Sequence, residues 1–497
     1  MASELTDTGE LYSPLVGLVY IFNLIVGTGA LALPKAFGEG GWVISTLVIV
    51  MLAFMSFLTV TFVVEVMAAS NALIRYRRKE KKKELEDSTS NSSDDVEDLM
   101  RDSDNEAKQR LLKDQDTLVK YSNVNAGRIC RSHTDFFEIT ERVEMGQMVS
   151  LFFNKVGKVV FYICLVVYLY GDLAIYAVAV PKSLMNVTCN INGDDDKAEC
   201  WKGHTISKIN VYRIYLTLFT LILGPFVFFN VQKTKYLQYF TTVMRWFAFC
   251  TMIIAALVAI ANGKGEGHPS KFSSITNVAN LFGVSIYSFM CHHSLPSLVS
   301  PIRNKTKLTK LFAFDYILIL SFYVFLCMTA IFCFATIEDL YTLNFSDNTV
   351  MPIKFFQYFL GLFPVFTLSA SFPIIAITLR NNLQTLFSRT GQPRPWMINR
   401  IGFPLLTIIP PIIVAFVTMN VEFLVSFTGS YAGATIQYVF PSLLVYYCRK
   451  KTNRYLGEQN YHKHTSPFKS TLWIVFVNIW TVICIVLVTY YHISRKQ

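Results

Sequence analysis

Long apolar stretches alternate with short polar connections along the whole chain. A helix needs about 20 mostly apolar residues to cross the hydrocarbon core of a bilayer, and eleven stretches meet that length. We therefore expect eleven membrane-spanning helices in an all-α integral membrane protein. They run from 14 to 37, 42 to 72, 157 to 185, 211 to 230, 236 to 261, 275 to 299, 308 to 334, 353 to 379, 398 to 418, 422 to 447 and 471 to 492.

The composition favours the same class. Hydrophobic residues make up 53% of the chain and charged residues 16%, whereas soluble domains contain about 25% charged residues. The formal net charge is +11, but the basic residues form short clusters between apolar runs, as in the cytoplasmic loops of membrane proteins. We expect a multi-pass protein of the lipid bilayer, with no nucleic acid as a partner.

The basic clusters also predict the orientation. With the N-terminus in the cytoplasm, most lysines and arginines of the loops lie on the cytoplasmic side, as the positive-inside rule requires. The glycosylation sequons at Asn186 and Asn344 then face outward. We predict glycans at both asparagines, in a plasma membrane or lysosomal membrane protein.

Residues 75 to 145 form the longest polar segment and are rich in Ser, Asn and Asp. Such a segment buries too little apolar area to offset its ordering entropy, so we expect a disordered cytoplasmic loop. At its end, FFEITERVEMGQM has the pattern of a short amphipathic helix on the membrane. The expected organisation is a cytoplasmic N-terminus (1 to 13), spans one and two (14 to 74), this loop (75 to 145), spans three to ten (146 to 447), a basic cytoplasmic loop (448 to 470), and span eleven with a short tail (471 to 497).

The chain has ten cysteines, and most of them lie inside apolar runs. Cys189 and Cys200 differ, because both fall in one polar loop beside the sequon at Asn186. This position predicts a disulfide in an oxidising compartment.

Two spans are interrupted by polar and small residues. In the first span Gly27 and Gly29 flank a threonine, and Pro34 removes a backbone donor. The sixth span reads GVSIYSFMCHHSLP and is broken in the same way, five spans later. Corresponding interruptions in two halves are typical of transporters built from inverted repeats, with the binding site where the helices unwind. Close helix packing through small residues is the alternative interpretation.

The chemistry of such a break follows from its backbone. The amides of Thr28, Gly29 and Ala30 begin a half-helix after Gly27, and its positive dipole end suits a carboxylate. Carbonyl groups freed before the break, together with the side chain of Asn23, offer oxygens of the kind that a small cation prefers.

These motifs resemble a known family. The first span (FNLIVGTGALALP) and the sixth (YSFMCHHSLPSL) are similar to the two signature helices of the amino acid/auxin permease family, in the amino acid-polyamine-organocation superfamily. Further similar stretches are VYLYGDLAIYA, FNVQKTKYLQ, GLFPVFTLSASFPIIAITLRNN and GSYAGATIQYVFP. The resemblance implies an inverted five-plus-five repeat with broken helices 1 and 6, an extra C-terminal helix, and symport of a small neutral amino acid.

The resemblance also implies site residues. Substrate contacts are expected at Gly27, Thr28, Gly29 and Ala30 of the first span, and at Tyr287, Phe289 and His292 of the sixth. Sodium-coupled members hold the ion with an Asn in span 1 and hydroxyl groups in span 8, and the matching positions here are Asn23, Ser369 and Ser371. No organic cofactor is implied, and Na⁺ or H⁺ is the expected coupling ion.

The acidic and basic residues inside the predicted spans include Asp172, Arg245, Glu65 and Asp315. Asp172 and Arg245 lie at similar depth, so we interpret them as a buried ion pair, with a proton or substrate role for Asp172 as the alternative. Glu65 and Asp315 lie near the cytoplasmic ends of their spans, where snorkelling explains their charge.

Two adjacent histidines follow the break in the sixth span. Imidazole titrates near physiological pH, so His292 or His293 is a candidate for proton coupling. Satisfaction of backbone groups at an unwound helix is the plainer interpretation. Asn23, Ser369 and Ser371 offer neutral oxygens, which suit sodium and favour it slightly.

No sequence motif of an enzyme or an ATP-driven pump is present, because G-x-S-x-G, H-E-x-x-H and the P-loop are all missing. We expect a secondary transporter of a small molecule rather than an enzyme. The rival interpretation is a transporter-like nutrient sensor, in which residues 75 to 145 bind a cytoplasmic protein.

Overall fold

A computed structural model describes residues 11–90, 135–189, 199–201, 206–229, 235–272, 275–346, 348–387, 395–456 and 462–494. These residues are almost entirely helical, and β-structure within them is limited to two isolated bridges, Tyr12 with Ile302 and Glu199 with Ser207. The prediction of an all-α protein is confirmed.

Local sequence accounts for the first helix boundaries. The helix α1 (Pro14–Ile25) begins with proline at its first position and with Ser13 as its N-cap. The helix α2 (Thr28–Gly40) ends at Gly41, which has a φ of 79° that favours glycine, and α3 starts at the next residue. The remaining elements are α3 (Trp42–Ser90), η1 (Asp135–Phe137), α5 (Met145–Phe152), α6 (Lys155–Thr188), α7 (Lys208–Leu223), η2 (Gly224–Phe228), α8 (Lys235–Ala261), α9 (Ile275–Ser288), α10 (Leu295–Val299), α11 (Leu308–Cys333), η3 (Tyr341–Ser346), α12 (Lys354–Leu386), η4 (Ile398–Gly402), α13 (Phe403–Val417), α14 (Val421–Thr428), η5 (Gly429–Gly433), η6 (Thr435–Val439), α15 (Phe440–Leu456) and α16 (Thr471–Ser494).

Within the described residues, eight helices are long and apolar enough to cross a membrane, and α1 with α2, bent by 56°, together have the length and composition of one further span. The predicted sixth span is divided into α9 and α10, and the predicted tenth span contains π-helical turns, η5 and η6, between α14 and α15. All eleven predicted stretches are helical, whereas the count of eleven crossings stays a prediction.

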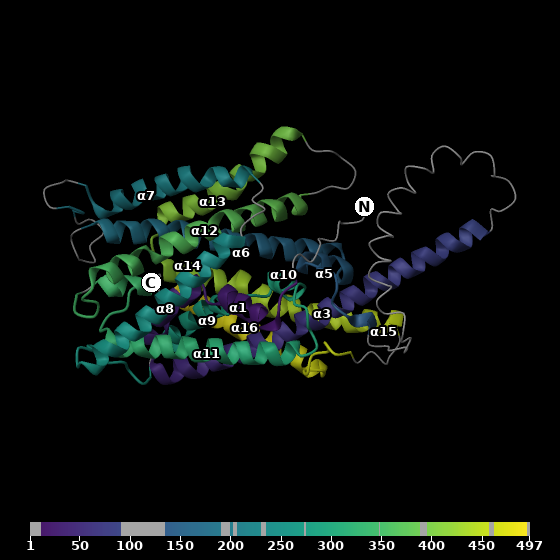
Figure 1. The fold of residues 1–497 in the computed structure, drawn as a ribbon, viewed down its shortest axis with the longest axis horizontal. Helices are drawn as coiled ribbons and strands as arrows, with labels where there is room; N and C mark the ends of the chain where they lie inside the picture. Colours follow the sequence, from purple (N-terminus) through teal and green to yellow (C-terminus); the bar gives the residue numbers. More distant parts are fainter. Residues whose placement is uncertain are drawn as a thin grey trace.

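The bundle is organised around two helix pairs. The helices α6 and α12 make the most extensive contact in the molecule, and α2 packs along α9. Figure 1 shows α7, α13, α12 and α6 on one side of the bundle and α11 along the other side, with the C-terminal part of α3 extending beyond the helices. Both broken spans therefore lie inside the bundle, against neighbours on several sides.

The predicted boundaries of the long polar loop are wrong at both ends. The helix α3 has 49 residues, and at about 1.5 Å per residue it is about two and a half times as long as the hydrocarbon core is thick. At the other end of the loop, the carbonyl oxygens of Phe136 and Glu138 accept hydrogen bonds from Arg75, and Asn71 binds the backbone of Glu141. The part of the loop from 91 to 134 lies outside the described residues.

The amphipathic segment at the end of this loop is only partly helical. Helix α5 starts after Glu144, whose side chain forms a capping box with Gln147. Its apolar residues Met145, Met148 and Val149 are buried against α6, α15 and α3. The segment packs on the bundle instead of lying on the membrane as expected. The predicted basic loop from 448 is likewise helical as far as Leu456.

Candidate functional site

The first break consists of Val26 and Gly27, between helices that differ in direction by 56°. Gly27 is the N-cap of α2 and provides no side-chain cap, although its carbonyl oxygen accepts from the amide of Ala30 at 3.1 Å. The first amides of a helix have no partner within the helix. The start of α2 therefore presents backbone donors and a positive dipole end toward the centre of the bundle.

The second break is longer and spans residues 289 to 294, between the end of α9 at Ser288 and the start of α10. Tyr323 of α11 connects the two breaks. Its hydroxyl lies 3.1 Å from the carbonyl oxygen of Ile25 and 2.9 Å from that of Ser288. One side chain thus reaches the last residue before each break, a connection that no local signal in the sequence indicates.

The two glycines of the first break have different surroundings. A Cβ on Gly29 would lie 2.5 Å from Oγ of Ser288 and 2.7 Å from its Cα, so Gly29 permits the close contact of α2 with α9. A Cβ on Gly27 would meet nothing closer than 3.9 Å. In this conformation Gly29 serves helix packing, whereas a Cβ on Gly27 would make only ordinary van der Waals contacts with the carbonyl oxygens of Leu24 and Ile25.

The predicted substrate contacts in the sixth span point to three different helices. The hydroxyl of Tyr287 faces the carboxyl group of Asp172 on α6. Phe289 packs against two tyrosine rings of α11, and Nε2 of His292 lies 2.8 Å from Oγ1 of Thr59 on α3. Among these residues, Tyr287 is the one that faces Asp172.

Asp172 is 5% exposed and lies between two tyrosines, Tyr168 on its own helix and Tyr287 on α9. One of its oxygens has no hydrogen-bond partner among the described residues. Tyr176, one further helical turn along α6, interacts with Thr28 at the start of α2 and is close to Asp172. The spacing of Tyr168, Asp172 and Tyr176 places them on one face of a helix, and this pattern was readable in the sequence.

The expected ion pair between Asp172 and Arg245 is absent, although both residues lie in the described part of the chain. Arg245 of α8 instead donates to the carbonyl oxygen of Asn23 and, at 3.0 Å, to its Oδ1. Tyr176 is close to both charged groups. The prediction was wrong because similar depth in the membrane does not place two side chains on facing sides of their helices.

The three residues expected at a sodium site are not joined by any hydrogen bond in the described structure. Nδ2 of Asn23 donates to Oγ1 of Thr242 at 2.8 Å, so both ends of this amide contact α8. On α12, the hydroxyl of Ser371 donates to the carbonyl oxygen of Thr367 at 3.0 Å, and Ser369 is half-buried. The two oxygens of Asn23 that would bind sodium thus already contact the guanidinium group of Arg245, which carries a permanent positive charge.

The two carboxylates expected to snorkel are both buried. Glu65 is 4% exposed and forms a two-point ion pair with Arg449, at 2.7 and 2.8 Å. Asp315 is 0% exposed, and neither of its oxygens has a hydrogen-bond partner among the described residues. Snorkelling is therefore wrong for both, since neither group reaches the surface.

Contacts close the bundle on the side opposite the N-terminus. Glu422, at the start of α14, accepts from Asn280 of α9 at 2.5 Å and lies 3.6 Å from Lys35 of α2. Asp339 bonds to Lys182 of α6 at 2.7 Å and to the amide of Val421 at 2.9 Å. These networks join the broken spans to α14 and α6.

The N-terminal side is closed by the backbone of Tyr12. Its amide donates to Pro301 at 3.0 Å, its carbonyl oxygen accepts from Arg303 at 2.9 Å, and its hydroxyl bonds to the carbonyl oxygen of Leu298. The start of the first span is thus attached to the end of the sixth, so the centre is covered on both sides.

A polar cavity of about 150 Å³ lies on the same side, lined by Glu65, Arg449, His462 and Lys469 among others. The segment from residue 462 to 470 covers it, with His462 stacked on Phe137 at 4.3 Å between ring centres. Burial lowers the pKa of His462 to about 4, and burial and His462 itself lower the pKa of His464 to about 4.

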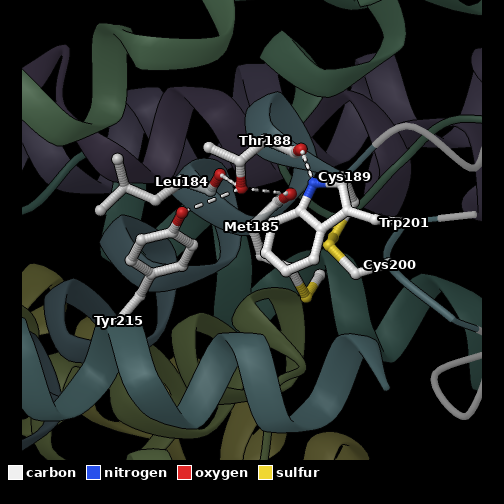
Figure 2. The surroundings of a disulfide bond; sticks show 7 residues. All are labelled: Leu184, Met185, Thr188, Cys189, Cys200, Trp201 and Tyr215. Atoms are coloured by element: carbon white, nitrogen blue, oxygen red, sulfur yellow. Dashed lines mark hydrogen bonds between the residues drawn. A yellow bond between two sulfur atoms is a disulfide. The ribbon is translucent and has the colours of Figure 1, made fainter. Parts of the chain in front are cut away.

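Far from the breaks, a disulfide joins Cys189 to Cys200, as expected (Figure 2). In Figure 2, Nε1 of Trp201 donates to the carbonyl oxygen of Thr188 at 2.9 Å, and the hydroxyl of Tyr215 donates to Oγ1 of Thr188 at 3.1 Å. Thr188 belongs to the sequon of Asn186, whose side chain is exposed. The disulfide and these bonds attach the end of α6 to α7.

The second sequon asparagine is engaged within its own loop. Nδ2 of Asn344 donates to the carbonyl oxygen of Thr336 at 2.9 Å, and its Oδ1 accepts from the amide of Glu338 at 2.9 Å. Both ends of this amide therefore stabilise the loop between α11 and α12.

Comparison with known proteins gives one family. The model of the family described as "Transmembrane amino acid transporter protein" matches residues 12–83 and 129–491. The chain is 52% identical to "Transmembrane protein 104" of Mus musculus, over 100% of this chain and 99% of that protein. It is 46% identical to "Transmembrane protein 104 homolog" of Drosophila melanogaster, over 97% of each. A solved structure, "Inward facing conformation of Mhp1", aligns with 99% of this chain and 93% of that chain, at a TM-score of 0.49 and 10% identity.

Proposed function

The chain belongs to the transmembrane amino acid transporter family and is a multi-pass transporter of the amino acid type rather than an enzyme, and we propose that it carries a small amino acid together with a proton. One observation carries this proposal. The backbone donors at the start of α2 and the buried carboxyl group of Asp172 lie close to one another, bridged by Tyr176.

This arrangement complements the two charges of an amino acid. The carboxylate fits the positive end of α2 at Thr28, where backbone amides begin the helix. The ammonium group fits the free oxygen of Asp172. Because a Cβ on Gly27 would meet no atom closer than 3.9 Å, while Gly29 is covered by Ser288, we place the approach of the substrate at Gly27.

The choice of proton over sodium is supported by Arg245. Its guanidinium group already contacts both oxygens of Asn23, so a sodium ion bound there would have to displace a fixed positive charge. Asp172, beside Tyr176, and the two histidines of the second break, His292 and His293, are groups that can take up a proton instead. Sodium at Asn23, Ser369 and Ser371 is the outcome that would replace this proposal.

Uptake by the purified protein in liposomes tests both parts. Labelled amino acids are supplied one at a time, with a pH gradient at constant Na⁺ and then with a Na⁺ gradient at constant pH. We expect uptake of a small amino acid that follows the pH gradient, and its loss in Asp172→Asn. As a matched control, Asp339→Asn removes the carboxylate that pairs with Lys182 on the side of the bundle opposite the N-terminus. This variant should leave the choice of coupling ion unchanged. Uptake that follows sodium and survives Asp172→Asn would contradict the proposal.

The sensor role is favoured by a different observation. The backbone at Phe136, Glu138 and Glu141 is anchored to α3, and α3 also contacts His292 through Thr59. A change at the sixth span can therefore be transmitted to the long loop. Deleting residues 91 to 130 separates the roles, since unchanged uptake with lost binding of a cytoplasmic protein assigns sensing to the loop.

We also propose that the N-terminus is cytoplasmic, in a plasma or lysosomal membrane, and that Asn186 carries a glycan. Its exposed side chain is accessible, whereas the amide of Asn344 is engaged by Thr336 and Glu338. Glycosidase digestion of Asn186→Gln and Asn344→Gln tests the orientation, and a glycan at Asn304 would reverse it.

A further inference from the structure

Asp315 is a buried acid with no described partner. It belongs to the apolar stripe of α11 that includes Phe312, Ile319 and Tyr323, and it is 0% exposed. Neither carboxyl oxygen has a hydrogen bond, and no ion pair to Asp315 occurs within the described part of the chain. A charged carboxylate is costly in such a position, so in this conformation the group is most stable with a proton bound.

The groups that face Asp315 are titratable but uncharged. They are Cys291, in the unwound segment of the sixth span, and Tyr316 on the same helix. Sγ of Cys291 lies 3.5 Å from the hydroxyl of Tyr316. Asp315 therefore borders the unwound segment from the side of α11.

Charged groups on the helices packed against α11 are engaged elsewhere. On α3, Glu65 pairs with Arg449. On α2, Lys35 pairs with Glu422, and on α8, Arg245 binds Asn23. On α1, Tyr20 bonds to Tyr239. None of these described groups supplies a counter-charge for Asp315.

The unwound segment connects Asp315 to the central site. Tyr168 contacts Asp172 and lies near His293, with 5.3 Å between ring centres, and it is also close to Cys291. His292 is near His293, and the Nδ1 atoms of both have no partner among the described residues. Buried groups that can accept or donate a proton thus extend from Asp172 to Asp315.

We propose that Asp315 is a second proton-binding site, which receives the transported proton from the central site through residues 289 to 294 and releases it on the N-terminal side. The carboxylate takes up one proton and becomes neutral, then returns to the carboxylate when that proton passes to water. Movement of the unwound segment would admit the water. This inference rests on the proposed proton coupling.

Infrared spectroscopy of the full-length protein in lipid nanodiscs tests the site without any substrate. The carbonyl stretch of a protonated carboxyl group is recorded from acidic to alkaline pH for wild type, Asp315→Asn and Glu65→Gln. We expect a wild-type band at neutral pH that Asp315→Asn removes and that Glu65→Gln, which removes an ion-paired carboxylate, leaves in place. Identical spectra of wild type and Asp315→Asn at every pH would overturn the assignment.

Two further measurements keep the test decisive. If Asp315→Asn fails to fold, as judged by size-exclusion chromatography, Asp315→Glu replaces it. A shifted infrared band then supports the site, whereas an unchanged band overturns it.

In liposomes, Asp315→Asn should still exchange labelled substrate across the membrane but lose accumulation driven by a pH gradient. Accumulation equal to wild type would overturn the role of Asp315 in release. A protein that transports nothing contradicts the proposed function, while the infrared result still decides whether Asp315 holds a proton.

Discussion

The two breaks in the bundle differ in how their polar groups are satisfied. At the first break, Arg245 binds Asn23, Tyr323 binds Ile25 and Tyr176 contacts Thr28, so side chains of three other helices hold it. At the sixth span, residues 289 to 294 are unwound, and buried polar atoms of Ser285, His292 and His293 have no described partner.

The difference indicates two roles. An unsatisfied buried donor or acceptor costs about 1–3 kcal/mol, so the sixth span gains most from a ligand, a water molecule or a proton. The first break is already supported and gains less. We infer that the first break is a fixed frame for the substrate and that the second is the part whose state changes.

The strongest test of the fixed frame is Arg245→Met. Each hydrogen bond to a charged group contributes about 1.5–3 kcal/mol, so losing both bonds to Asn23 should lower the free energy of unfolding by about 3 kcal/mol or more. The variant also exposes the oxygens of Asn23. We expect Na⁺, compared with choline, to raise the melting temperature of Arg245→Met but not that of wild type. A variant as stable as wild type would show that the first break needs no such support.

The next largest effect is expected at Gly29. The first added carbon of Gly29→Leu would lie 2.5 Å from Oγ of Ser288, and overpacking of this kind costs about 1–3 kcal/mol. Gly27→Ala is the matched control, because the nearest atom to its Cβ is 3.9 Å away. We expect Gly29→Leu to have a lower melting temperature than wild type and Gly27→Ala to have that of wild type. Uptake should nevertheless be reduced in Gly27→Ala. Equal melting temperatures would argue against a packing role for Gly29.

Tyr323→Phe removes the hydroxyl that connects the two breaks. The carbonyl oxygens of Ile25 and Ser288 share the single proton of this hydroxyl, and its loss should cost about 1–2 kcal/mol. Tyr316→Phe, on the same helix, removes only a contact to the sulfur of Cys291 at 3.5 Å and should cost less. Melting temperatures in detergent measure both. If Tyr316→Phe lowers the melting temperature more than Tyr323→Phe does, the contacts of Tyr323 do not support the breaks.

A smaller and pH-dependent effect is expected on the N-terminal side. The folded pKa of His462 is about 4 because the imidazole is buried, whereas the unfolded value is about 6.5. The unfolded segment therefore binds the proton first, and stability falls as the pH drops from about 6.5 toward 4. Protonated Nδ1 also cannot accept from the amide of His464. Protease cleavage between 462 and 470 should increase with acid, and His462→Phe should weaken this dependence, because His464, whose pKa is also about 4, still contributes.

The smallest change is expected at Ser285, on the other side of the comparison. Its hydroxyl is buried without a described partner, so Ser285→Ala removes an unsatisfied group and should not lower the free energy of unfolding. If the hydroxyl contacts a ligand or water during transport, uptake by Ser285→Ala should fall although the free energy of unfolding does not. A loss of stability equal to that of Tyr323→Phe would remove the distinction between the breaks.

The features that follow from the sequence are those with local causes. Apolar length predicts the spans, Gly27 and Pro296 mark the two breaks, and two cysteines in one short polar loop indicate the disulfide. Each of these features, the spans, the breaks and the disulfide, depends on the backbone or on residues that are neighbours in the sequence. The four-residue spacing of Tyr168, Asp172 and Tyr176 was also available, and it indicates the face of α6 that borders the site.

The partner of each intramembrane charge was decided by the tertiary structure alone. Arg245 binds Asn23, 222 residues away, and Glu65 binds Arg449, 384 residues away, while Asp315 has no described partner. Sequence gives the depth of a side chain in a span, because depth depends on the rise per residue. It does not give the rotation of each helix or its neighbours, because these are set by packing of the whole bundle.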